Sequence, residues 1–125
     1  MNAVIAKISM FGQRSGEDRF EIILEIGTPY LCGDRPEEWA CPVALSPLYE
    51  RLCDMRGVSS FQALCLAIAL AQELLADFKE KGGSLTFETG EEFPLQAYSC
   101  GLAARRGIAQ HGDQAGGLSS GGPAT

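Results

Sequence analysis

One segment, residues 59–81, constrains the fold more than any other part of the chain, because it carries the signals of a single long helix. Ser59 and Gln62 form a capping box, which marks the first turn of a helix. Cations in the last turn and glycines after it mark the other end: Lys79, Lys81, Gly82 and Gly83. Cations are stabilising near the negative, C-terminal end of the helix dipole. Glycine readily adopts the left-handed conformation that ends many helices. We therefore predict a helix over residues 59–81.

The first half of this helix lacks a polar face. Residues 63–71 contain no charged or strongly polar side chain. One apolar stripe at helical spacing consists of Phe61, Leu64, Ile68, Ala71, Leu75 and Phe78. A second stripe consists of Leu66, Leu70 and Leu74, with Ala63 and Ala67 beside them. We expect a sheet to cover the first stripe, so the second must meet either another part of this chain or another protein.

Strand-forming runs precede the helix. Residues 3–12 and 18–27 are rich in β-forming side chains, and the polar segment 13–17 between them predicts a hairpin loop. In the second run apolar residues at 20, 22, 24 and 26 alternate with Glu21, Ile23 and Glu25, which gives one dry and one mostly wet face. We expect residues 28–38, with their prolines and acids, to form a loop.

The next residues predict further strands. Residues 39–46 alternate as a strand, and Pro42 places it at an edge, a start or a bulge, because proline cannot donate to a ladder. Residues 47–57 suit a strand or a short helical turn, and a strand is favoured because an isolated hairpin needs neighbours. After the helix, residues 84–89 predict a strand and residues 93–99 a short one.

These elements predict an α+β fold in which an antiparallel sheet of four to six strands packs on one long helix. Residues 1–102 are expected to form this single domain. From residue 103 the chain becomes rich in Gly, Ser, Ala and Gln. Such a segment buries too little apolar surface to offset its ordering entropy, so residues 103–125 are predicted to be a flexible, disordered tail.

Charge and cysteine usage limit the partners and the compartment. The net charge of −6, with scattered basic residues, disfavours nucleic acid and suits a basic protein partner. The five cysteines show no CxxC spacing, and no secretory signal opens the chain, so we expect reduced thiols and a cytoplasmic protein. Gln72, Glu73 and Asp77 interrupt an apolar run shorter than the about 20 residues that a membrane span needs.

Most catalytic chemistries lack their residues. The single histidine, His111, falls in the predicted tail, so neither a Ser-His-Asp system nor a Cys-His pair has a base. Zinc sites with two or three histidines are excluded by count, and no nucleotide-binding or metalloprotease motif occurs. We therefore expect a non-enzymatic protein without a metal or a cofactor.

Two acidic clusters leave an alternative open. The first consists of Asp34, Glu37 and Glu38, and the second of Glu88, Glu91 and Glu92. A small-ligand-binding protein or a carboxylate-based enzyme could use the 34–41 and 88–92 loops if both converged beside Trp39 in one cleft. Otherwise the acids are solvated loop rims. Trp39 itself is either an aromatic anchor at a binding surface or a plug in the core.

Three short motifs stand in a fixed order: Ile26-Gly27-x-Pro29, Trp39-x-Cys41-Pro42 and Gly57-x-Ser59-Ser60-x-Gln62-Ala63-Leu64. In this order and spacing, over residues 18–90, the chain resembles an uncharacterised family of small bacterial domains of unknown function. The resemblance implies a hairpin, a Trp-x-Cys-Pro strand and a long helix in a bacterial protein, and it implies no activity. The chain departs from the family in the length of its 47–57 segment and in its Gly-rich tail.

The leading hypothesis is a small cytoplasmic protein that acts through protein–protein interaction. It would form a homodimer through Leu66, Leu70 and Leu74, since symmetric pairs are the commonest assemblies. An immunity or antitoxin-like role against a basic partner is the other version, and it depends on the acidic charge alone.

Overall fold

The computed structural model describes residues 3–99, so the predicted domain boundary at residue 102 and the predicted tail lie outside the described residues. The strands form a four-stranded sheet in the order β5-β2-β1-β7 and a three-stranded sheet in the order β3-β4-β6, and all pairs are antiparallel. Their bounds are β1 Val4–Gln13, β2 Phe20–Gly27, β3 Tyr30–Asp34, β4 Glu37–Cys41, β5 Val43–Ser46, β6 Met55–Gly57 and β7 Ser84–Thr86.

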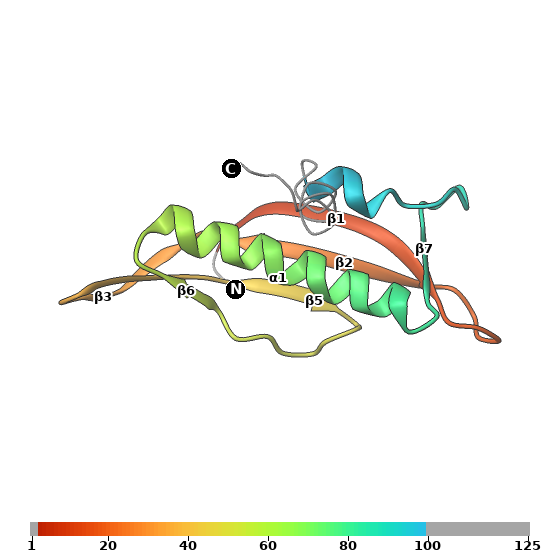
Figure 1. Cartoon of the computed structure of the whole chain (residues 1–125), viewed down its shortest axis with the longest axis horizontal. Helices are drawn as coiled ribbons and strands as arrows, with labels where there is room; N and C mark the ends of the chain where they lie inside the picture. The colour runs from red at the N-terminus through yellow and green to blue at the C-terminus, as the bar shows by residue number, and fades with distance from the viewer. Residues whose placement is uncertain (1–2, 100–125) are drawn as a thin grey trace, which may run out of the picture. The chain divides into compact units, whose positions relative to one another are not determined.

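One long helix, α1 (Ser60–Glu80), runs along the strands and contacts both sheets (Figure 1). Strands and helix belong to one compact unit that ends at Phe93, and the short 3-10 helix η1 (Leu95–Ser99) follows it. The predicted α+β class, with antiparallel sheets packed on one long helix, is confirmed. The predicted strand at 93–99 is wrong, because η1 occupies this segment.

The predicted hairpin is formed by β1 and β2. Met10 lies opposite Ile22, and both side chains are fully buried. On the other face of the same strands Lys7 pairs with Glu25 at 3.9 Å. The period of two in the sequence therefore separates a dry face from a wet face, as predicted.

The predicted loop at 28–38 is wrong, because β3 and β4 form a second hairpin there. β2 leads through two residues into β3, and β4 leads across Pro42 into β5, so the four strands make one long ribbon that bends between the two sheets. Gly27 N–H donates to the Pro42 carbonyl at 2.9 Å and holds the bend. The prolines and acids are tolerated because much of the hairpin is exposed, and they hid its strand character.

The segments on either side of α1 form less strand than expected. Residues 39–46 divide at Pro42, as the missing N–H of proline suggests. Of the predicted strand at 47–57 only β6 forms, apart from an isolated bridge between Tyr49 and Leu45. β7 covers the first half of residues 84–89.

Both predicted ends of the helix are confirmed. The Ser59 side chain accepts a hydrogen bond from Gln62 N–H at 3.1 Å, and the Gln62 side chain accepts one from Val58 N–H at 2.7 Å. At the other end Gly82 has a φ of 97°, and Gly83 N–H donates to the Phe78 carbonyl at 3.0 Å. This is a Schellman stop, which needs a left-handed residue after the helix.

The face that α1 buries matches the first predicted stripe at Ala71, Leu75 and Phe78 and differs from it in the first half of the helix. The buried residues are Ala63, Ala67, Ala71, Leu75 and Phe78. The alanines lie at the centre because small side chains let the helix backbone approach the strands, and the leucines flank them. Phe61 and Ile68, which were expected under the sheet, are 74% and 40% exposed.

The second predicted stripe is partly covered by its own chain. Leu66, Leu70 and Leu74 are each half-buried, and Leu70 packs against the core cluster around Ala67. Of the two predicted alternatives, the structure shows contact with the same chain at Leu70, so this stripe is not the free surface that a homodimer through these leucines would need.

By length and composition alone, α1 could cross a membrane, so the expectation that it is too short is wrong. Its alanine stripe, however, is packed against strands, as in the core helix of a globular protein. In this structure α1 therefore packs as the core helix of the domain.

The close approach of α1 is testable at Ala67, which has no exposed surface. Ala67→Leu should destabilise the protein by about 1–3 kcal/mol, because extra methyl groups force the helix away from the strands. Urea unfolding followed by circular dichroism measures this. Ala76→Leu, on the exposed face of the same helix, is the matched control and should change stability by less than about 0.5 kcal/mol. Equal effects at the two positions would contradict the packing.

The helix cap provides a second test. Ser59→Ala removes the acceptor for Gln62 N–H and should cost about 1 kcal/mol of unfolding free energy. Ser60→Ala, at the first helical residue, should be nearly neutral in the same urea titration. A smaller loss at residue 59 than at residue 60 would show that the cap is misplaced.

Candidate functional site

The tip of the β3–β4 hairpin and the start of α1 enclose an open groove of about 700 Å³. Residues 33–38 of the hairpin form one side, and residues 56–58 with Gln62 form the other. Asp34, Glu37 and Glu38 all line this groove, so the structure brings the first predicted acidic cluster together.

The groove is less acidic than the sequence suggests. Arg35 and Arg56 line it beside the three carboxylates, and the Arg56 guanidinium lies 3.2 Å from the Glu38 carboxylate. The negative charge of Glu38 is the main cause that raises the pKa of Arg56 above its ordinary value, and Cys32 is the next largest cause. Arg56 therefore stays charged. Local charge is nearly balanced, and a basic partner gains little attraction from this groove.

Trp39 closes the core beneath the start of α1. It is half-buried, packs against the cluster that contains Cys41 and Ala63, and donates its indole N–H to the Glu37 carboxylate. Its neighbour across the strands is Gly57, where a Cβ atom would approach Ala63 N to 2.8 Å. Trp39 therefore packs as a partly buried core residue, which is one of its two predicted roles, and it does not line the groove.

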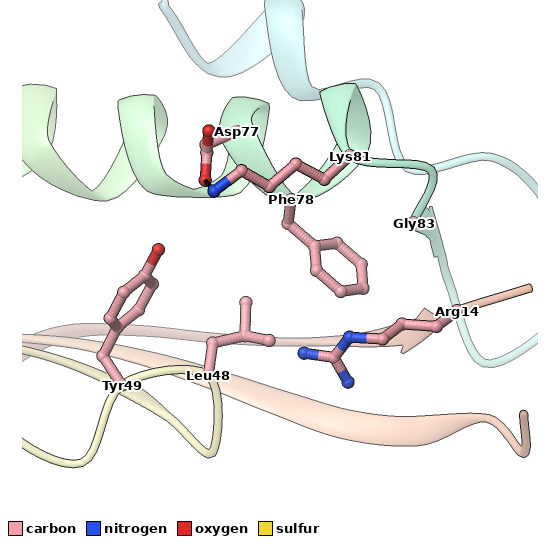
Figure 2. A pocket seen from close by; sticks show the side chains of 7 residues that line it. All are labelled: Arg14, Leu48, Tyr49, Asp77, Phe78, Lys81 and Gly83. Atoms are coloured by element: carbon pink, nitrogen blue, oxygen red, sulfur yellow. Dashed lines mark ion pairs between the residues drawn. The ribbon is translucent and has the colours of Figure 1, made fainter.

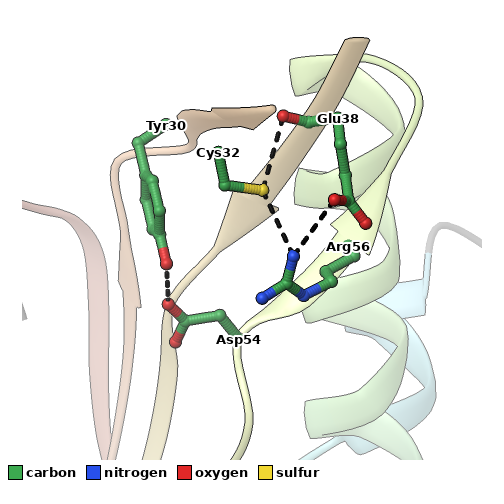
Figure 3. A network of polar contacts seen from close by, with 5 residues as sticks. All are labelled: Tyr30, Cys32, Glu38, Asp54 and Arg56. Atoms are coloured by element: carbon green, nitrogen blue, oxygen red, sulfur yellow. Dashed lines mark hydrogen bonds and ion pairs between the residues drawn. The ribbon is translucent and has the colours of Figure 1, made fainter. Parts of the chain in front are cut away.

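A polar network that the sequence did not reveal ties β6 to the β3–β4 hairpin (Figure 3). The Tyr30 hydroxyl donates to the Asp54 carboxylate. The Cys32 thiol donates to the Glu38 carbonyl at 3.4 Å and accepts from Arg56 at 3.4 Å. These contacts pin the short edge strand. Tyr30 and Cys32 are two residues apart, as expected for one face of a strand, and this spacing could have indicated the network. It was missed because residues 28–38 were predicted to be a loop.

The second acidic cluster lies elsewhere. β7 pairs with Phe11–Gln13 near the end of α1, whereas the β3–β4 hairpin lies beside its beginning (Figure 1). Arg19 donates to the Glu88 carbonyl at 3.2 Å, and Glu92 pairs with Lys79 at 3.4 Å. The convergence of the 34–41 and 88–92 loops beside Trp39, which the ligand-binding or enzymatic alternative required, is therefore not found.

The largest exposed apolar side chains near the groove lie on and before the first turn of α1. Val58 is 73% exposed and Phe61 is 74% exposed. We define the outer patch by its exposed members: Val58, Phe61, Cys65, Ile68 and Ala69. Spacings of four and three residues place Phe61, Cys65 and Ile68 on one helix face. No charged residue occurs between Arg56 and Glu73.

Within residues 3–99, no group of three or more His, Cys, Asp or Glu side chains is arranged to hold a metal ion. Comparisons with protein-family models, with curated proteins and with solved structures give no match. The resemblance to a bacterial family therefore stays a prediction, and function must be argued from the geometry of this surface.

The Tyr30–Asp54 contact predicts a pH response. The hydrogen bond to Asp54 raises the pKa of Tyr30 above its ordinary value of 10.0, because the carboxylate favours the protonated phenol. The contact therefore stabilises the fold below about pH 10 and is lost as pH rises through the higher folded pKa. Asp54→Asn should lower the highest tyrosine pKa in an absorbance titration of the phenolate. Tyr30→Phe assigns that transition, and an unchanged titration in Asp54→Asn would refute the contact.

Proposed function

We propose that this protein acts through protein–protein contact and that the outer patch of α1 pairs with the same patch of a second copy. The observation that carries the proposal is the exposure of Val58, just before α1, and Phe61, in its first turn, within an uncharged stretch of the chain. A contiguous exposed apolar patch on a small domain marks an interaction surface more often than a free one. In this proposal the protein is cytoplasmic and non-enzymatic.

The magnitudes suit a reversible dimer. Full burial of a large apolar side chain contributes about 1.5–3 kcal/mol. Two copies of Val58, Phe61 and Ile68, discounted for the surface already covered, contribute roughly 6–11 kcal/mol on that scale. The entropic cost of association is about 4–15 kcal/mol. The balance favours an assembly that depends on concentration.

An antiparallel pairing of two α1 helices fits the residues of the patch. If Cys65 of one copy faces Ile68 of the other, Phe61 faces Gln72 across the symmetry axis. The same register places Glu73 beside the first turn of the opposite helix, where a carboxylate complements the positive end of the dipole. No like charges meet within the patch, so the net charge of −6 opposes pairing only at longer range.

The other expectation, an immunity or antitoxin-like protein that binds a basic partner, has weaker support. The overall acidity favours it, but the groove near the patch also contains Arg35 and Arg56, and Arg56 pairs with Glu38. A second copy needs no such complementarity, and we therefore propose the homodimer.

Sedimentation velocity across a dilution series of the full chain tests the proposal. The wild-type protein should pass from dimer to monomer on dilution, and the double variant Phe61→Ser/Ile68→Ser should stay monomeric, because the apolar contact is removed. Leu31→Ser, at a side chain 50% exposed on β3, is the matched control and should still dimerise. A wild-type monomer at every concentration, or a double variant that dimerises normally, would exclude this patch.

The exposed Cys65 thiol supplies an independent readout. A short bis-maleimide should cross-link two copies of the wild-type protein, and Cys65→Ser should lose that product. Cross-linking that persists in Cys65→Ser would assign the contact to another exposed thiol, such as Cys32 or Cys53, and would contradict the proposed pairing. Urea unfolding of each variant confirms that the monomer remains folded.

A further inference from the structure

A cavity of about 190 Å³ lies at the other end of α1, and the proposed dimer does not use it (Figure 2). It is built from the turn after β1, the segment after β5 and the last turn of α1. Its lining residues are Arg14, Leu48, Tyr49, Asp77, Phe78, Lys81 and Gly83.

Arg14 is held in place by aromatic rings. Its guanidinium carbon lies 5.3 Å from the ring centroid of Phe20 and 5.3 Å from that of Phe78. The two rings pack edge to face with centroids 6.1 Å apart. Cation–π contact fixes the guanidinium but leaves its in-plane N–H groups available. Among the described residues no carboxylate forms an ion pair with Arg14.

The other charges of the cavity neutralise each other. The Lys81 ammonium lies 3.0 Å from the Asp77 carboxylate, and this contact raises the pKa of Lys81 above its ordinary value. The Tyr49 hydroxyl is directed toward this pair (Figure 2). Arg14 is therefore the unbalanced cation of the cavity, in a chain whose net charge is −6.

We propose that this cavity binds the carboxylate group of a molecule that carries a short apolar chain. The planar guanidinium of Arg14 matches two carboxylate oxygens, and Leu48 with Phe78 supplies an apolar wall for the chain. Asp77 in the wall disfavours a doubly charged phosphate. A volume of 190 Å³ equals about six water molecules at about 30 Å³ each, which suits an acid of a few carbon atoms.

Titration of the isotope-labelled full chain with hexanoate, followed by amide NMR shifts, tests the site. Shifts should concentrate at Arg14, Tyr49 and Lys81 and saturate in about the millimolar range, as expected for a ligand of this size. Hexanamide, the neutral analogue, should bind at least about tenfold more weakly, because it lacks the charge that Arg14 pairs. Shifts that never saturate, or that spread over all surface cations, would overturn the proposal.

Variants separate the guanidinium from general positive charge. Arg14→Gln should weaken hexanoate binding at least about tenfold, and Arg14→Lys should weaken it as well, since an ammonium lacks the paired donors. Lys7→Gln, a cation on the outer face of the sheet, is the control and should bind as the wild type does. Full affinity in Arg14→Gln with an unchanged fold would refute the assignment.

Further ligands define the chemistry. Inorganic phosphate that shifts the same amides at lower concentration than hexanoate would overturn the preference for a carboxylate. Acetyl-alanyl-leucine, which ends in a free carboxylate, distinguishes the two sources of this group. Tighter binding of the peptide would assign the site to chain termini, and tighter binding of hexanoate to free acids; either result supports the proposed chemistry.

Discussion

The close packing of α1 against the strands is the constraint on which the rest of the structure depends. Ala63, Ala67 and Ala71 are almost completely buried along the centre of the contact. At the two ends glycines allow the same approach: a Cβ atom at Gly57 would meet the first turn, and one at Gly83 would lie 2.4 Å from the Phe78 ring. Interiors are packed too densely to accept larger groups at such positions, so small residues fix how the helix is rotated.

That rotation creates both candidate surfaces. Because the alanines face the strands, Phe61 and Ile68 point away from the core and form the outer patch with Cys65. At the other end the same rotation lays Phe78 against Phe20, and the two rings hold Arg14 at the mouth of the cavity. One packing choice therefore produces an apolar surface at the start of the helix and a cationic cavity at its end.

The candidate site was predictable only where its residues are neighbours in the chain. Asp34, Glu37 and Glu38 were expected to cluster, and they line one groove because a tight hairpin keeps them together. Arg56, which neutralises Glu38, enters from β6, and its position depends on the register between β4 and β6. Local sequence carries no information on that register, so the charge balance of the groove could not be foreseen.

The sequence by itself determined the elements whose signals are local. The cap at Ser59, the glycine stop after Lys81 and the alternation in β2 depend on residues a few positions apart, and each was predicted correctly. Only the tertiary structure decided that the first half of α1 buries Ala63 and Ala67, since hydrophobicity ranks leucine and phenylalanine above alanine while close packing favours the smallest side chain. The bend at Pro42 and the clamp on Arg14 likewise join segments far apart in the chain, and only the folded arrangement brings them together.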